Sequence, residues 1–387
     1  MKTKIVGILI VLVSIVVVSS VNASTPGDWT QNNVSGFGDV DNYAVLSLAS
    51  FNGTLYAGTA NGSGDGAQFM KFENNGWVSV STNGFGNVNN DRISDLIEFK
   101  NNLYAGTGNE TDGGQILRSN NGTTWDVVTP PTLDPSNGEF VHFAVFDEQI
   151  YASTSSITVT QGAEIWRSST GNSGSWSQVV TNGFGDVNNK TIITLHQFNG
   201  KYYAGTDNTV TGTEVWCSND GTSWSQVNAD GFGDTYNWGV VLQGFSGYLY
   251  AGTYNYAASD NPGSELWRCQ ICDGTDWQQF PVAKGFGDTE NRAIRSLIIY
   301  NNELYAATYN RTSGIEVWAS SNGIDWEQVN VDGFGNSDNI FPYWDNSTCV
   351  FDGGWYVGTW NHVSGGEVWK YVQRHTIYLP LILKDAG

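Results

Sequence analysis

A four-residue motif that recurs along the chain constrains the fold more than any other feature. Gly-Phe-Gly followed by Asp or Asn begins at Gly36, Gly84, Gly183, Gly231, Gly285 and Gly333. Successive copies are 48, 99, 48, 54 and 48 residues apart, and the interval of 99 corresponds to two units, the second of which lacks the motif. The chain therefore contains seven repeat units. A repeat of about 40–50 residues is typical of solenoids and propellers.

Each unit contains four short runs separated by turn residues. In the unit that follows Gly183 the runs are 191–198, 201–206, 214–217 and 224–227, and Asn199-Gly200, a hairpin-turn dipeptide, separates the first two. Four antiparallel strands form one blade, and a radial arrangement of blades leaves few exposed sheet edges. Gly, Asn and β-branched residues are too frequent for helices. The predicted fold is all-β, a single seven-bladed β-propeller with four-stranded antiparallel blades.

The two ends of the repeat region complement each other. Residues 28–34 precede the first motif and match the fourth run of a unit, which begins at Trp224. The seventh unit ends at Trp369-Lys370 without a fourth run of its own. We therefore expect residues 24–35 to supply the fourth strand of the last blade, so that 24–372 form one closed ring.

The turn between the third and fourth runs resembles a known family motif. Ser-Asn-Asn-Gly-Thr-Thr-Trp at 119–125, Ser-Asn-Asp-Gly-Thr-Ser-Trp at 218–224 and Ser-Ser-Asn-Gly-Ile-Asp-Trp at 320–326 resemble the Asp-box, or bacterial neuraminidase repeat. The family pattern has one more residue between the Asp and the Gly. The resemblance implies a stabilised blade corner in an exported propeller. Because the family includes sialidases, other glycosidases and non-enzymatic receptors, it does not select one function.

The two termini of the sequence differ from the repeats. Lys2 and Lys4 precede an apolar run at 5–18, and Val-Asn-Ala at 21–23 supplies a small-residue cleavage site, which together predict a signal peptide over 1–23. The short apolar tail at 373–387 is interpreted as a strand that covers part of the ring, with a sorting signal as the alternative. The mature protein is therefore expected to be secreted or displayed at the cell surface, with no membrane span.

Composition restricts the partners. The net charge of −21 argues against nucleic acid and anionic membranes, which both require basic patches. The same charge suits calcium, which oxygen ligands bind, and no other cofactor is predicted. No His spacing indicates a metal site. In an exported chain, Cys269 and Cys272 are expected to form a local disulfide at a corner of the fifth blade.

Polar residues that recur in most units are interpreted as structural, because catalysis needs one differentiated site. The acidic residue two positions before the third-run Trp is Glu164, Glu214, Glu265, Glu316 and Glu367. The Asp or Asn that ends the Gly-Phe-Gly motif is expected to cap its own turn, with the Phe ring packed between blades.

Differences between units are more informative about function. The residue after the second-run Thr is Ala60, Gly108, Ser155, Asp207, Tyr254, Tyr309 and Trp360 in units one to seven. In propellers this position lies on the face where variable loops gather and ligands usually bind. Units five to seven therefore place aromatic rings on one sector of that face. Rings of this kind suit a sugar face or a peptide.

The predicted ligand-binding set comprises Trp238, Tyr254, Tyr256, Arg292, Tyr309, Tyr343, Trp344 and Trp360. Arg295 and Arg311 lie in the same sector, and arginines there can bind a carboxylate or sulfate in a bidentate manner. The preferred interpretation is a non-enzymatic module that binds a glycan or cell-surface polymer. Packing of the rings on one another and binding of a protein partner remain alternatives.

An enzyme is the competing class. A sialidase gathers three arginines on a carboxylate, but Arg118, Arg167 and Arg268 share one repeat position and are therefore interpreted as scaffold. A glycoside hydrolase needs two carboxylates about 5–10 Å apart. Asp260, Glu290 and Asp345 do not recur and are candidates, but the sequence does not bring them together. A glycoside hydrolase or polysaccharide lyase therefore stays the alternative, with no catalytic residue assigned.

Overall fold

The computed structural model describes residues 29–255, 263–280, 282–342 and 345–373. The predicted signal peptide and all but the first residue of the predicted tail lie outside these ranges. The described residues form 28 strands and eight short 3-10 helices, with no α-helix among them. In this part of the chain, no helix is long and apolar enough to cross a membrane.

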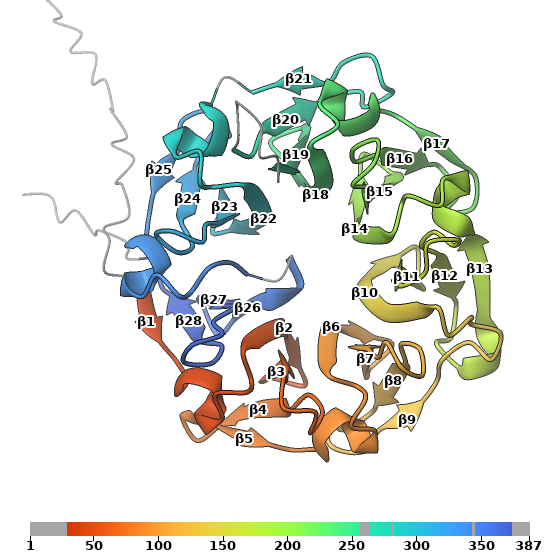
Figure 1. Cartoon of the computed structure of the whole chain (residues 1–387), viewed down its shortest axis with the longest axis vertical. Coiled ribbons are helices and arrows are strands. Elements are labelled where there is room, and N and C mark those ends of the chain that lie inside the picture. Colours follow the sequence, from red (N-terminus) through yellow and green to blue (C-terminus); the bar gives the residue numbers. More distant parts are fainter. Residues whose placement is uncertain (1–28, 256–262, 281, 343–344, 374–387) are drawn as a thin grey trace, which may run out of the picture.

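The strands pair antiparallel in groups of four, which form the blades of a β-propeller around a central axis (Figure 1). The first blade contains β2 (Ala44–Phe51), β3 (Thr54–Ala60), β4 (Phe69–Glu73) and β5 (Gly76–Ser79). The second contains β6 (Arg92–Phe99), β7 (Asn102–Gly108), β8 (Ile116–Ser119) and β9 (Asp126–Val127). The third contains β10 (Asn137–Phe146), β11 (Gln149–Ser156), β12 (Ile165–Ser168) and β13 (Trp176–Val180).

The remaining blades follow the same plan. The fourth contains β14 (Thr191–Phe198), β15 (Lys201–Asp207), β16 (Val215–Ser218) and β17 (Trp224–Gln226). The fifth contains β18 (Asn237–Phe245), β19 (Tyr248–Asn255), β20 (Leu266–Cys269) and β21 (Gln278–Gln279). The sixth contains β22 (Ala293–Tyr300), β23 (Glu303–Tyr309), β24 (Val317–Ser320) and β25 (Glu327–Gln328). The last contains β26 (Thr348–Phe351), β27 (Gly354–Gly358), β28 (Val368–Tyr371) and β1 (Trp29–Gln31).

The Gly-Phe-Gly motif forms a tight turn before the first strand of six blades. These turns are η1 (Ser35–Gly38), η2 (Asn83–Gly86), η4 (Asn182–Gly185), η5 (Asp230–Gly233), η6 (Lys284–Gly287) and η7 (Asp332–Gly335). In η4, Gly183 has φ +63°, and a Cβ there would lie 2.7 Å from that of Asn189. Phe184 also has φ 63°, and its ring stacks on Trp216 of the following blade with centroids 4.5 Å apart. Phe184 also packs on the cluster that blades three and four share, so the ring lies between blades, as predicted.

A buried carboxylate fixes the corner beside four of these turns. Glu214 accepts hydrogen bonds from the Trp216 indole at 2.8 Å and from the Asn189 amide at 2.6 Å. Burial raises the pKa of Glu214 above its ordinary value, and these two donors offset part of the rise. Glu316 repeats the contacts with its own Trp and Asn, at 3.0 and 2.6 Å. The recurring glutamates therefore have a structural role.

The N-terminal strand completes the last blade. β1 pairs antiparallel with β28, so that Trp29 lies opposite Tyr371. The Trp29 indole donates to the Val329 carbonyl at 3.0 Å, and its ring lies 4.9 Å from the rings of Phe334 and Tyr371. The predicted pairing of residues from both ends of the repeat region is therefore present in the structure.

The first strand of the last blade is shorter than expected. The sequence predicts that this blade begins at Ile340. Ile340 and Phe341 do exchange backbone hydrogen bonds with Trp360, at 3.1 and 2.9 Å, but β26 itself begins only at Thr348. The 3-10 helix η8 (Asp345–Ser347) precedes β26, and Asn346 reaches other blades. Its amide nitrogen donates to the carbonyls of Val141 at 2.5 Å and Ser94 at 3.2 Å. Asn346 therefore contacts the backbone of two other blades just before β26 begins.

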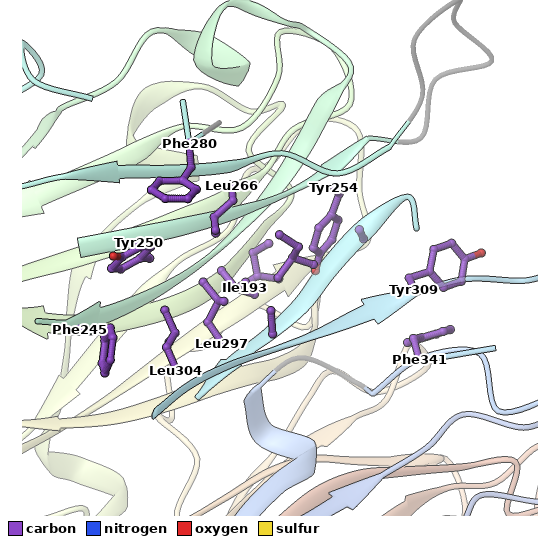
Figure 2. Packing of buried hydrophobic residues seen from close by; sticks show 14 of the residues in the cluster. Ile193, Phe245, Tyr250, Tyr254, Leu266, Phe280, Leu297, Leu304, Tyr309 and Phe341 are labelled. Carbon is purple, nitrogen blue, oxygen red and sulfur yellow. The ribbon is translucent and has the colours of Figure 1, made fainter. Parts of the chain in front are cut away.

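The hydrophobic core is a series of clusters between neighbouring blades. The largest joins blades three to six with Phe341, and Figure 2 shows it extending from Phe245 and Leu304 to Tyr254, Tyr309 and Phe341. Val141, Ile193 and Val241 belong to the same cluster and are almost completely buried. Apolar side chains from blades three to five therefore meet in one cluster.

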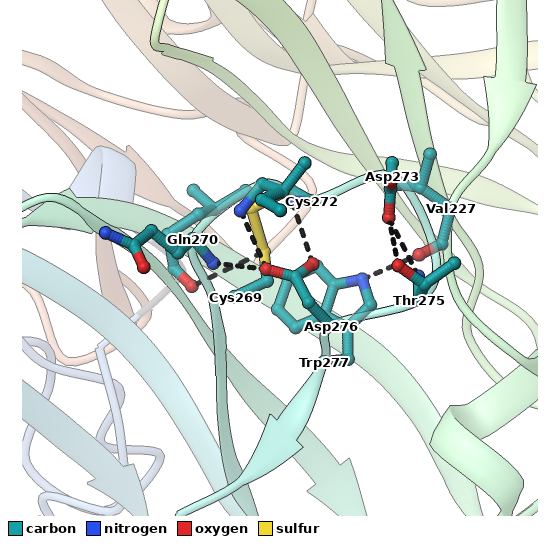
Figure 3. The surroundings of a disulfide bond; sticks show 10 residues. Val227, Cys269, Gln270, Cys272, Asp273, Thr275, Asp276 and Trp277 are labelled. Atoms are coloured by element: carbon teal, nitrogen blue, oxygen red, sulfur yellow. Dashed lines mark hydrogen bonds between the residues drawn. A yellow bond between two sulfur atoms is a disulfide. The ribbon is translucent and has the colours of Figure 1, made fainter.

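The cysteine pair lies at the end of β20. Cys269 and Cys272 form a disulfide, with their Cα atoms 5.1 Å apart. The Asp276 carboxylate accepts the backbone N–H groups of Gln270, Ile271 and Cys272 at 2.7–2.9 Å (Figure 3). In the third blade, the equivalent turn contains η3 (Ser173–Ser175), a 3-10 helix that does not belong to the Gly-Phe-Gly motif. The disulfide and Asp276 therefore hold the same turn of the fifth blade.

Candidate functional site

The variable residues at the ends of the second strands lie at equivalent places, where neighbouring blades meet. They pair with the first strand of the next blade in the bridges Ala60–Arg92, Gly108–Glu139, Ser155–Thr191, Tyr254–Ala293 and Trp360–Ala44. The last of these bridges joins the last blade to the first. We call this side of the propeller the variable face, because its residues differ from blade to blade.

An arc of rings extends along the variable face. Tyr309 contacts Phe341 edge-on at 5.0 Å, and Phe341 stacks on Trp360 at 4.9 Å. Trp360 in turn lies 4.9 Å from Tyr43 of the first blade, whose ring stacks on His362 at 4.5 Å. We call these five rings the aromatic arc. It continues the predicted sector past the junction of the last and first blades.

The depth of the rings changes along the arc. Tyr309 is 3% exposed and Phe341 is 7% exposed, so both are part of the core. Trp360 and Tyr43 are half-buried, and His362 is exposed. A ligand can therefore reach the arc at its Trp360–Tyr43–His362 end.

A buried guanidinium lies beside the inner end of the arc. Arg295 of β22 is 8% exposed and donates to the Tyr254 hydroxyl at 3.1 Å. Its guanidinium carbon lies 4.3 Å from the Tyr254 ring, 4.9 Å from Phe341 and 5.7 Å from Tyr309. Cation–π contacts of this kind stabilise a guanidinium group that is largely removed from water. Tyr254 and Tyr309 therefore pack against Arg295, which explains their burial.

Among the variable residues at the ends of the second strands, Asp207 is the acidic one. It ends β15 and is half-buried. Burial raises the pKa of Asp207 to about 6, and the charge of Arg295 offsets part of the rise.

Beside Tyr43, at the outer end of the arc, the variable face carries an acidic group that is already paired. Arg92 of β6 lies 3.0 Å from Glu110, 3.4 Å from Asp91 and 3.6 Å from Glu139. Burial raises the pKa of Asp91, and Arg92 offsets part of that rise. One arginine thus serves three carboxylates, and this group was not expected from the sequence.

Close to this acidic group, Asn346 connects to a buried histidine. The Asn346 amide oxygen lies 2.6 Å from His142 Nδ1, which in turn lies 3.8 Å from Asp95. Burial lowers the pKa of His142 below its ordinary value, and the contact with Asn346 offsets part of that. The Asp95 carboxylate also accepts the backbone N–H of Phe143 at 2.5 Å. Asn346 therefore ties the last blade to blades two and three.

The structure brings together part of the predicted ligand-binding set. Tyr254, Tyr309 and Trp360 lie along one sector, whereas Arg292 pairs with Glu290 at 3.2 Å and Trp238 is half-buried. Tyr256, Tyr343 and Trp344 lie outside the described residues. Tyr43 and His362 were missed, although both flank residues of the recurring pattern.

The enzyme candidates from the sequence do not form a described pair of carboxylates. Glu290 is engaged by Arg292, Asp260 lies outside the described residues, and only the backbone of Asp345 is described. Among the described residues, no group of three or more His, Cys, Asp or Glu side chains is arranged to hold a metal ion. On the opposite side of the propeller from the variable face, a hollow of about 550 Å³ is lined by residues that include His196, Gln243 and Ile299.

Comparisons with known proteins support the fold. No family model and no curated protein matches the chain. The structure of YCF48 bound to D1 peptide is 14% identical with a TM-score of 0.57, covering 92% of this chain and all of that one. The WD40 β-propeller domain of Doa1 is 10% identical with a TM-score of 0.56, covering 89% of this chain and 97% of that one.

A third similar structure is an ancestral GH74 enzyme, with 14% identity and a TM-score of 0.59. The match covers 87% of this chain but only 48% of the enzyme, so the chain spans about half its length. At these identities the similarity shows the fold alone. The chain is a β-propeller.

Proposed function

We propose that the protein is an exported, non-enzymatic binding module that holds a carbohydrate on its variable face. The supporting observation is the aromatic arc, whose half-buried Trp360 and Tyr43 rings lie beside exposed His362. A sugar ring presents an apolar face that stacks on such rings, and its hydroxyl groups suit nearby carboxylates and amides. Arg292 and Trp238, with Tyr256, Tyr343 and Trp344 beyond the described residues, extend the proposed site.

A closed ring of seven blades underlies this proposal. Two contacts support closure: the pairing of β1 with β28, and the bridge between Ala44 and Trp360. Because the second contact lies in the aromatic arc itself, the proposed site depends on the junction of the first and last blades. Secretion, removal of residues 1–23 and binding of calcium stay predictions.

The first prediction concerns Trp360→Ala, measured against a glycan array and then by titration of the best glycan. Removing a stacked ring from the centre of a binding site costs about 1–3 kcal/mol, so we expect roughly 10- to 100-fold weaker binding. Trp77→Ala is the matched control, because Trp77 is half-buried but packs on Phe37 and Phe72 away from the arc. Unchanged glycan binding by Trp360→Ala would refute the proposed site.

One observation favours a second candidate, a glycoside hydrolase. Asp207 carries a raised pKa of about 6, which suits a general acid near neutral pH. Release of reducing ends from a polysaccharide, lost in Asp207→Asn, would establish this enzyme in place of the binding module. A protein partner is the third candidate from the sequence and stays untested.

A further inference from the structure

The variable face is electrically divided. Its acidic side carries Asp91, Glu110 and Glu139, which already share Arg92. The other side, at the inner end of the aromatic arc, carries two guanidinium groups close to one ring. This division bears on which carbohydrates the proposed site would accept.

The two guanidinium groups approach Tyr309 from different elements. Arg295 belongs to β22 and lies 5.7 Å from the centre of the Tyr309 ring. Arg311 follows β23 and lies 5.5 Å from the same ring, and it is exposed. No ion pair joins Arg311 to a carboxylate of the described residues. Two like charges thus lie near the one ring of Tyr309.

Two cations held close together repel each other, and the repulsion is stronger where water is excluded. Arg295 is 8% exposed, so its field is less screened than that of a surface arginine. An anion bound at Arg311 would reduce this repulsion and complete a charge-assisted pair. The carboxylates beside Tyr43, at the outer end of the arc, do not serve this purpose, because they are engaged by Arg92.

We propose that this cationic side of the variable face selects acidic glycans, with Arg311 binding their carboxylate or sulfate groups directly. Arg295 is a positioning residue, which holds Tyr254 and Tyr309 in place and adds positive charge beneath the site. This proposal rests on the proposed function, because it names the class of glycan that the same site would take. The sugar rings would stack on the outer arc while their anionic groups meet Arg311.

The test uses two pairs of polysaccharides that differ mainly in charge. The mature chain is titrated with polygalacturonate and its methyl ester, and with dextran sulfate and dextran. We expect at least one acidic member to bind about tenfold or more tightly than its neutral partner, the size of one charge-assisted contact. The preference should decrease as salt is raised, since exposed charges are screened.

Arg311→Gln should abolish most of this preference by weakening binding of the acidic member to about the level of its neutral partner. Arg167→Gln is the matched control, since Arg167 also lies over a tyrosine ring, 5.9 Å from Tyr151, but on the third blade away from the arc. Arg295→Lys keeps the charge but not the planar contacts, so it should retain part of the preference. Arg311 is exposed, so its variant tests the proposal even if variants of Arg295 fail to fold.

Any of three results would overturn the acidic-glycan proposal and leave the proposed function intact. They are equal binding of acidic and neutral members, tighter binding of the cationic polysaccharide chitosan, and an unchanged preference in Arg311→Gln. Absence of binding to every polysaccharide and to a glycan array would overturn both.

Discussion

At the scale of single residues, the phenylalanines of the repeated turn accept an unfavourable backbone conformation. Phe37, Phe85, Phe184, Phe232, Phe286 and Phe334 all have φ between 55° and 63°. A residue with a Cβ loses roughly 1–2 kcal/mol in this left-handed region relative to the right-handed one. The stacking of each ring on a blade must therefore exceed that cost.

This balance gives an unusual order of stability for substitutions at Phe184. Phe184→Ala removes the ring and keeps the strain, so we expect a loss of about 2 kcal/mol in the free energy of unfolding. Phe184→Gly also removes the ring but relieves the strain, so it should be more stable than the alanine variant by about 0.5–1 kcal/mol. Urea unfolding measures both, and the reverse order would show that the turn is unstrained.

Asp207 provides a prediction about pH. Its pKa of about 6 in the folded protein lies above the ordinary value near 3.9. Between these values the unfolded chain loses the proton and the folded chain keeps it, so folding stability falls as pH rises through this window. Above pH 6 the loss is complete.

Asp207→Asn removes this dependence. Its stability relative to the parent should be near zero at pH 4 and should increase by about 1–2 kcal/mol by pH 7, after a discount for partial exposure. Thermal unfolding at both pH values measures the difference. A constant difference would mean that the carboxyl group of Asp207 titrates normally.

At the scale of the blade, the Glu214 carboxylate accepts hydrogen bonds from two other side chains at one corner. Glu214→Ala would leave the Trp216 indole and the Asn189 amide without an acceptor, which costs about 2–3 kcal/mol. Glu214→Gln should cost less than about 1 kcal/mol, because Gln115 already accepts the Asn90 amide at 2.9 Å in the second blade. Glu98→Ala, exposed on β6, is the control and should be neutral. A glutamine variant as unstable as the alanine variant would show that the charge itself is needed.

Elements of the blade could be predicted from the sequence wherever the signal is local. The Asn199-Gly200 turn, the runs around it and the structural role of Glu214 follow from repetition and turn chemistry. The last blade shows where this reasoning ends. β26 begins only at Thr348, and just before it Asn346 binds the backbone of Ser94 and Val141, more than 200 residues away. No local pattern encodes such contacts.

At the scale of the whole molecule, Trp29 holds the two ends of the repeat region together. Trp29→Ala should reduce the free energy of unfolding by about 3–5 kcal/mol, because the ring is buried against Phe334, Trp355 and Tyr371. Thr30→Ala, on the exposed side of the same strand, should change it by less than about 0.5 kcal/mol. A Trp29 variant with unchanged stability would refute closure by β1.

The candidate site could be predicted only in part, because its residues come from different strands and blades. Comparison of units located the variable position at Tyr309 and Trp360, but it treated each unit separately. Tyr309 is buried because Arg295 and Phe341 come from other strands. Tyr43 joins the arc because the first blade meets the last, a contact that no single unit contains.

The pairing of β1 with β28 also affects the order in which the protein is completed. β1 is synthesised first among the strands, yet its partner at Val368–Tyr371 is synthesised last. Contacts so distant in sequence form slowly, and a waiting strand edge is open to association with other chains. A nascent or truncated chain that ends before Val368 therefore carries a strand with nowhere to dock, which makes premature termination a route to aggregation.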